Sequence, residues 1–179
     1  MSESDDLLKE GVEEARTRFD RAVAMTMAVV AVLLATDALF GHRAHTEELL
    51  NQAKASDQWT YFQAKTVRRT MFEVGAELAR TLSAAPSAST TAVVASFGAN
   101  VARYDRETKA IEEQAREYER ERDCEARRAN RYDLAEIFLE VAIVTCSIAI
   151  LTKHRGIWMA SAAVAAAGVV VALTVLRIP

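Results

Sequence analysis

The sequence predicts an all-α membrane protein with three transmembrane helices and a long antiparallel helical (coiled-coil) hairpin between the first and second. Three runs of apolar residues are each long enough to cross roughly 30 Å of hydrocarbon as a helix. The stretch between the first two runs carries apolar residues at alternating three- and four-residue steps, the heptad pattern of a coiled coil. The one extended break signal in that stretch lies near its middle. Together these observations define the fold class.

The composition excludes several classes of function. The 179 residues carry a net charge of −3, and acids alternate with bases instead of leaving the basic stripe that a nucleic-acid surface needs. The two cysteines imply no disulfide framework. No nucleophile, base and orienting acid stand at a spacing that predicts catalysis. We therefore expect no enzymatic activity, no cofactor and no nucleic-acid partner.

The chain begins with a helical segment that leads into a membrane span. Residues 1–21 predict an amphipathic N-terminal helix, because apolar residues recur on one helical face. Residues 22–40 predict transmembrane helix 1. The acidic tail before this run, and the lack of a small-residue cleavage site after it, argue against a secretory signal peptide. We interpret the run as an uncleaved anchor.

Residues 41–133 predict the extramembrane hairpin, with its tip near residues 83–89, where Pro86 and several serines interrupt the helical pattern. Arms taken as residues 43–82 and 93–132 are equal in length, about 60 Å each as helices, so an antiparallel pair returns to the same membrane face. The predicted hairpin seam consists of Ala64, Val67, Met71, Val74 and Leu78 in the first arm and of Val94, Phe97, Val101, Tyr104, Ile111, Ala115 and Tyr118 in the second.

Charged residues dominate the second arm, where nine bases and ten acids lie between Arg103 and Asp133. We interpret them as a solvated helix face. Helices with so thin an apolar seam are marginally stable alone, so we expect the hairpin to pack against other copies of itself. Toward the membrane the first-arm register passes through Asp57 and Thr60. This polar stretch would permit a change of register between the arms.

Residues 134–151 and 157–176 predict transmembrane helices 2 and 3. The third span is rich in alanine and also contains Ser161 and Gly168, small residues that let helices approach closely in lipid. Basic residues precede the first span and occupy the short turn between the second and third. This distribution favours a cytoplasmic N-terminus and a hairpin outside the cell.

Three acidic residues form the candidate functional site: Asp37 near the end of the first span, and Glu136 and Glu140 near the start of the second. Because these helices run in opposite directions, the carboxylates are expected at similar depth. Ionisable residues inside a membrane usually face protein or water. Structural pairing and a cation or proton pathway are both compatible with the pattern. A third alternative is a metal site in which His42 and His45, three residues apart, join a carboxylate.

Several stretches resemble a bacterial membrane-protein family catalogued as domain of unknown function 4337. They are Gly41-His42-Arg43, Lys54 to Trp59 followed by Tyr61 to Lys65, and Arg131 to Leu134. The resemblance covers nearly the whole chain from the first span onward. It implies a three-span protein of the bacterial inner (cell) membrane, and it supplies no activity or ligand.

The favoured function is an integral membrane protein that acts as a homo-oligomeric structural or interaction scaffold and projects the hairpin. The first alternative is a cation or proton channel lined by the three acidic residues, since acidic rings concentrate cations. The second is a membrane-coupled sensor that switches register at the polar stretch of the hairpin. Expected partners are other copies of the chain, the lipid bilayer and, for the channel, cations. The protein partner of the hairpin stays open.

Overall fold

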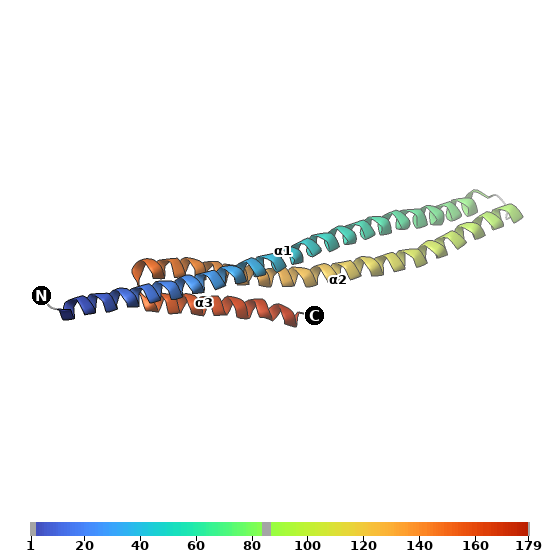
Figure 1. The fold of residues 1–179 in the computed structure, drawn as a ribbon. Coiled ribbons are helices and arrows are strands. Elements are labelled where there is room, and N and C mark those ends of the chain that lie inside the picture. The colour runs from blue at the N-terminus through green and yellow to red at the C-terminus, as the bar shows by residue number, and fades with distance from the viewer. Residues whose placement is uncertain (1–2, 84–86, 179) are drawn as a thin grey trace. The chain divides into compact units, whose positions relative to one another are not determined.

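The computed structural model describes residues 3–83 and 87–178, with side chains from Thr17 onward. It contains α1 (Glu3–Leu82), α2 (Ala88–Thr152), α3 (Arg155–Leu173) and a short 3-10 helix, η1 (Thr174–Arg177) (Figure 1). The described residues form no strand, so the all-α prediction is confirmed. Each of the three α-helices contains a stretch long and apolar enough to cross a membrane.

α1 continues from the N-terminal segment through the first apolar run and into the first arm without a break. The predicted amphipathic face of residues 1–21 depends mainly on side chains before Thr17, which lie outside the described residues. α1 ends at Leu82, directly before the predicted tip at residues 83–89, and α2 begins within it at Ala88. Residues 84–86 of the tip are also outside the described part. Ser87 caps α2, because its Oγ accepts a hydrogen bond from the Thr90 amide at 3.1 Å.

A tight turn joins α2 to α3. Lys153 adopts a positive φ of 56°, which ends the α2 helix. His154 then has an extended conformation and caps α3, because its Nδ1 accepts a hydrogen bond from the Gly156 amide. The turn is held to α1 by an ion pair between Lys153 and Asp20. α3 can therefore reverse direction and pack back against α2.

The chain divides into two compact units, of which the first combines residues up to Thr46 with residues from Cys124 onward. We call it the three-helix unit. One core cluster consists of Val30, Leu139, Ala142 and Ala165. A second cluster consists of Val23, Cys146 and Ala149. Each cluster joins α1 to α2, and the first also includes α3.

Small residues permit a close approach of α3 to α2. A Cβ placed on Gly168 would lie 3.0 Å from Phe138 Cβ and 3.2 Å from the Ala135 carbonyl oxygen, so any side chain there would require these neighbours to shift. Ser161 is fully buried, and its Oγ lies 3.1 Å from Cys146 Sγ. The small-residue side of α3 thus faces α2 within the same chain.

The second unit, Glu47–Asp123, contains the remaining parts of α1 and α2. We call it the two-helix unit. Its two helices run antiparallel, as the cross-helix contacts show: Trp59 Nε1 donates to Glu119 at 2.9 Å, Lys65 Nζ donates to Glu107 at 2.6 Å, and Phe72 contacts Phe97. The further a residue lies along α1, the earlier in α2 its partner lies, as expected for antiparallel helices.

Candidate functional site

Asp37 is the most deeply buried acid among the described residues. It lies on α1 in the three-helix unit and is 5% exposed. Neither carboxylate oxygen has a hydrogen-bond partner in the described part of the chain. Glu136 and Asp133 of α2 are close enough to interact with it electrostatically. A buried carboxylate without a partner costs free energy, so packing alone does not explain an acid at this position.

Asp37 also contributes to the wall of a cavity of 250 Å³. The wall is mostly apolar and consists of Leu33, Thr36, Asp37, Phe40, Tyr132, Leu139, Val169, Ala172, Leu173 and Leu176. Phe40 stacks on Tyr132 with ring centroids 6.1 Å apart. Burial, together with the nearby Asp37 carboxylate, raises the pKa of the Tyr132 phenol.

The structure separates Glu140 from this environment. Glu136 is half-buried, whereas Glu140 is exposed and forms no ion pair with any residue that the structure describes. Its neighbours one turn away on α2, Ile137 and Val144, are exposed apolar residues. Of the three predicted acids, the structure thus brings Asp37 and Glu136 together, and it leaves Glu140 on the outer face of the three-helix unit.

The two histidines do not converge. His45 Nε2 lies 3.1 Å from an oxygen of Asp133, while the His42 side chain is exposed. In the described part of the chain, no three side chains of His, Cys, Asp or Glu are grouped closely enough to hold a metal ion. The residues named for the metal alternative are therefore not assembled into a site.

The second-arm members of the predicted seam lie against α1 in the two-helix unit. Tyr104, Ile111 and Ala115 are buried. The remaining members, Val94, Phe97, Val101 and Tyr118, are half-buried. Thr108, in the same register, is buried and its hydroxyl donates to the Tyr104 carbonyl oxygen at 2.9 Å. This face of α2 is therefore the contact surface for the first arm.

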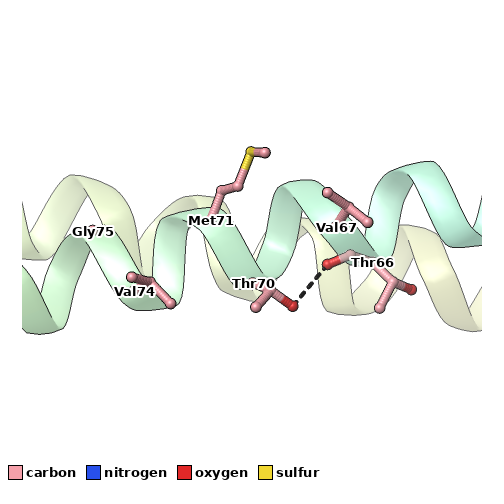
Figure 2. A pocket seen from close by; sticks show the side chains of 6 residues that line it. All are labelled: Thr66, Val67, Thr70, Met71, Val74 and Gly75. Atoms are coloured by element: carbon pink, nitrogen blue, oxygen red, sulfur yellow. Dashed lines mark hydrogen bonds between the residues drawn. The ribbon is translucent and has the colours of Figure 1, made fainter.

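The first-arm members face away from α2, which corrects the assignment of these residues to the seam between the arms. Exposed fractions are 53% for Val67, 67% for Met71, 60% for Val74 and 54% for Leu78, and Ala64 is exposed as well. We call this set, Ala64, Val67, Met71, Val74 and Leu78, the α1 stripe. Part of it lines a cavity of 470 Å³ together with Thr66, Thr70 and Gly75 (Figure 2). The stripe is an unoccupied apolar surface within the two-helix unit.

α1 instead contacts α2 through a mixed aromatic and charged face. The Phe72 ring lies 5.6 Å from Phe97 and 5.8 Å from Tyr104, measured between centroids. On the same face, Lys65 pairs with Glu107, and Arg69 Nη1 lies 3.2 Å from Asp105. Aliphatic periodicity alone misses this face. The sequence does contain a signal for this face. The bases Lys65 and Arg69 on the first arm lie about as far from the tip as the acids Glu107 and Asp105 on the second arm.

The same rotation of α1 affects the sensor hypothesis. Asp57 and Thr60 are exposed, and the Thr60 hydroxyl donates to the Ser56 carbonyl oxygen of its own helix. Nearby, Asn51 is buried, and the Gln52 side chain accepts a hydrogen bond from Arg122 of α2 at 2.9 Å. The two residues on which the register switch depended are therefore not between the arms.

Comparison with known proteins gives one match. No curated protein and no solved structure matches the sequence. The family described as "Domain of unknown function (DUF4337)" matches residues 19–176, which includes all three apolar runs and the whole two-helix unit. The resemblance seen in the sequence is thereby confirmed, and the chain belongs to the DUF4337 family.

Proposed function

We propose that this protein is a homo-oligomeric membrane scaffold, without enzymatic activity, whose copies associate through the α1 stripe. The observation that carries the proposal is the exposure of four large apolar side chains, Val67, Met71, Val74 and Leu78, on one face of a helix that is already paired through another face. Contiguous apolar surface on a water-exposed unit marks an interaction site. The alternating steps of the stripe are those of a heptad seam.

A second copy of the chain is the occupant that fits this stripe. Copies inserted in one bilayer with the same orientation have their α1 helices parallel, so identical stripes can meet in register around an axis normal to the membrane. Such a contact is self-complementary, with Met71 opposite Met71 and Val74 opposite Val74. The hairpin then has two seams: one between its own arms, and one between copies.

The membrane-facing helices support the same proposal. Glu140 lies on an exposed face of α2 beside Ile137 and Val144. If that face met lipid, the carboxylate would cost at least about 2.5 kcal/mol near the bilayer centre. A neighbouring copy that covers the face removes the carboxylate from hydrocarbon. Association within the bilayer and along the hairpin would then act together.

The mass of the purified particle in lipid nanodiscs tests the proposal. We expect a dimer or larger ring for the unmodified chain. Val74→Glu combined with Met71→Glu should lower the subunit number, because charges would face each other across the stripe. Val93→Glu is the matched control, since Val93 is exposed on α2, outside the stripe. A monomer for the unmodified chain, or an unchanged mass for the double variant, would overturn the proposal.

A second candidate function is a cation or proton pathway. The observation that favours it is Asp37, whose buried oxygens have no partner among the described residues, with Glu136 close by. Isolated buried acids in membrane segments occur in proton relays and ion pathways. In an oligomer, Glu140 from each copy would add an acidic ring.

Flux measurements in proteoliposomes test this candidate separately. Asp37→Asn and Glu140→Gln should each reduce proton or cation flux at least tenfold, and Glu113→Gln, an exposed acid on the two-helix unit, should leave it unchanged. Flux that is absent from the unmodified protein, or that survives both site variants, would exclude the pathway. The Asp37→Asn result does not depend on the mass measurement above, whereas an effect of Glu140→Gln requires an oligomer.

A further inference from the structure

A second cavity in the three-helix unit has a basic lining. Its volume is 490 Å³. The lining residues come from α2 and from the C-terminal end that follows α3, and they are Arg127, Asn130, Arg131, Thr174, Arg177 and Ile178. Three guanidinium groups thus share one concave surface, although Arg177 is far in the sequence from Arg127 and Arg131. None of these residues belongs to the acidic site or to the α1 stripe.

The three arginines have no counter-charge among the described residues. Neighbouring arginines on α2 do: Arg128 Nη1 lies 2.7 Å from Glu125, and Arg122 Nη2 lies 2.6 Å from Asp123. Arg127, Arg131 and Arg177 form no ion pair or hydrogen bond with the described part of the chain. Like charges that share a cavity repel one another. An anion bound between them would relieve that repulsion.

The apolar surface next to the cavity indicates what kind of anion fits. Leu134 on α2 lies one turn beyond Arg131 and is exposed, as is Ile137 after it. On α3, Leu173 and Val170 are exposed on the side that precedes Thr174. Each helix therefore passes from a basic segment to an exposed apolar segment at the end of a predicted membrane span. An anionic lipid matches this order, because its charged headgroup would lie against the basic segment and its acyl chains against the apolar segment.

We propose that this cavity binds the phosphate headgroup of an anionic phospholipid. Guanidinium groups bind phosphate through paired N–H donors, and the Asn130 amide can add another donor. The Thr174 hydroxyl donates to the Val171 carbonyl oxygen at 2.6 Å, so it offers no further donor. The exposed Leu134 and Leu173 receive the acyl chains. Basic pockets between membrane helices bind anionic headgroups in this way on the cytoplasmic side, and the pairing of guanidinium with phosphate is the same at either leaflet. The inference rests on the proposal that the three apolar helices cross a bilayer.

Native mass spectrometry of the full chain, released from membranes of defined lipid composition, tests the inference. We expect phosphatidylglycerol to remain bound and phosphatidylcholine to dissociate. Each arginine near an anionic headgroup contributes roughly fivefold in affinity, so Arg127→Gln, Arg131→Gln and Arg177→Gln together should weaken phosphatidylglycerol binding about a hundredfold. Arg131→Gln alone should weaken it about fivefold.

A triple variant with the same loss of charge is the control. Arg68, Arg106 and Arg120 are exposed arginines of the two-helix unit, and their replacement by Gln should leave lipid retention unchanged. Equal retention of the two lipids, or equal loss in both triple variants, would overturn the inference. Displacement of the lipid by millimolar inorganic phosphate would assign the cavity to free phosphate instead. The same spectra report the subunit number, so failure of the oligomer proposal is distinguishable.

Discussion

At the scale of single residues, Asp37 and Gly168 show two different constraints on the three-helix unit. Asp37 introduces a buried carboxylate whose oxygens have no partner in the described part of the chain. Gly168 occupies a position where an added Cβ would meet Phe138, Leu139 and the Ala135 carbonyl oxygen at 3.0 to 3.2 Å. The first constraint lowers stability and suits a functional role. The second is purely steric.

Asp37→Leu is expected to raise the thermal stability of the protein in nanodiscs. The substitution removes the desolvation penalty of an unsatisfied carboxylate, roughly 1 to 3 kcal/mol, and the adjacent cavity of 250 Å³ has room for the larger side chain. Asp37→Asn keeps the polar group buried and should give a smaller gain. A fall in unfolding temperature for Asp37→Leu would show that the carboxylate is paired in the membrane-embedded protein.

Gly168→Val is expected to destabilise the packing of α3 on α2. The branched side chain would have to displace backbone and Cβ atoms, and overpacking of this kind costs about 1 to 3 kcal/mol. Ala167→Val is the matched control, because Ala167 is exposed on the same helix. Thermal unfolding followed by tryptophan fluorescence compares the two. Equal unfolding temperatures would mean that α3 does not approach α2 so closely.

At the scale of the helices, charge pairs lie beside the aromatic contacts between α1 and α2 in the two-helix unit. The hydrogen bond from Lys65 of α1 holds the pKa of Glu107 below its ordinary 4.5. The pKa of Asp105 is also below its ordinary 3.8, mainly because of Lys109 on the same helix and to a smaller extent because of Arg69 of α1. The bond to Glu107 in turn raises the pKa of Lys65 above 10.5. Exposed pairs of this kind contribute little individually and are screened by salt.

The pairing between the arms is therefore expected to weaken in acid. A lowered folded-state pKa contributes stability that is complete above the unfolded value and is lost as the pH falls through the folded value. For Lys65 the sign is opposite, so its contribution is lost only as the pH rises through its folded pKa, above 10.5. Urea unfolding followed by circular dichroism measures this loss of stability, when the free energy of unfolding at neutral pH is compared with that at a pH below the ordinary carboxyl pKa values.

Glu107→Gln should remove part of this acid sensitivity, and Glu113→Gln, an exposed acid without an ion pair in the described structure, should not. High salt should reduce the difference between the two variants, because the charges are at the surface. Identical pH profiles for the unmodified chain and Glu107→Gln at low salt would show that the Lys65 pair does not hold the arms together.

At the scale of the whole molecule, the three apolar helices are long enough to cross a membrane. If all three cross it, the hairpin and the C-terminal end lie on one side, and the turn at His154 and the N-terminus lie on the other. We propose that the hairpin side is outside the cell, because basic residues precede the first span and occupy the turn between the second and third. In the opposite orientation the hairpin and the C-terminal end would be inside the cell, and the turn at His154 and the N-terminus would be outside.

Cysteine accessibility checks this topology. In a chain with Cys124 and Cys146 replaced by alanine, Ser83→Cys and Ile178→Cys should react with an impermeant maleimide in intact cells. His154→Cys should react only after the cells are opened. The reversed pattern would reverse the orientation. Reaction of Ser83→Cys and His154→Cys from the same side would contradict three crossings.

The sequence by itself determined the elements of this protein. Apolar run length specified three helices able to cross a membrane, and the second-arm periodicity through Tyr104, Ile111 and Ala115 identified the face of α2 that contacts α1. These properties are local, because each depends on the spacing of residues within one helix. The proximity of Asp37 to Glu136 could also be predicted from the sequence, because residues at the same depth in two antiparallel helices lie near each other.

Only the tertiary structure decided the rotation of α1. Two faces of its first arm repeat with helical spacing: the aliphatic α1 stripe, and the face with Phe72, Lys65 and Arg69. Periodicity favours the first, but the partner arm offers aromatic rings and carboxylates, and these pair with the second. The choice depends on residues that are distant in sequence. For the same reason, the basic cavity of Arg127, Arg131 and Arg177 became visible only when α2 and the C-terminal end were placed side by side.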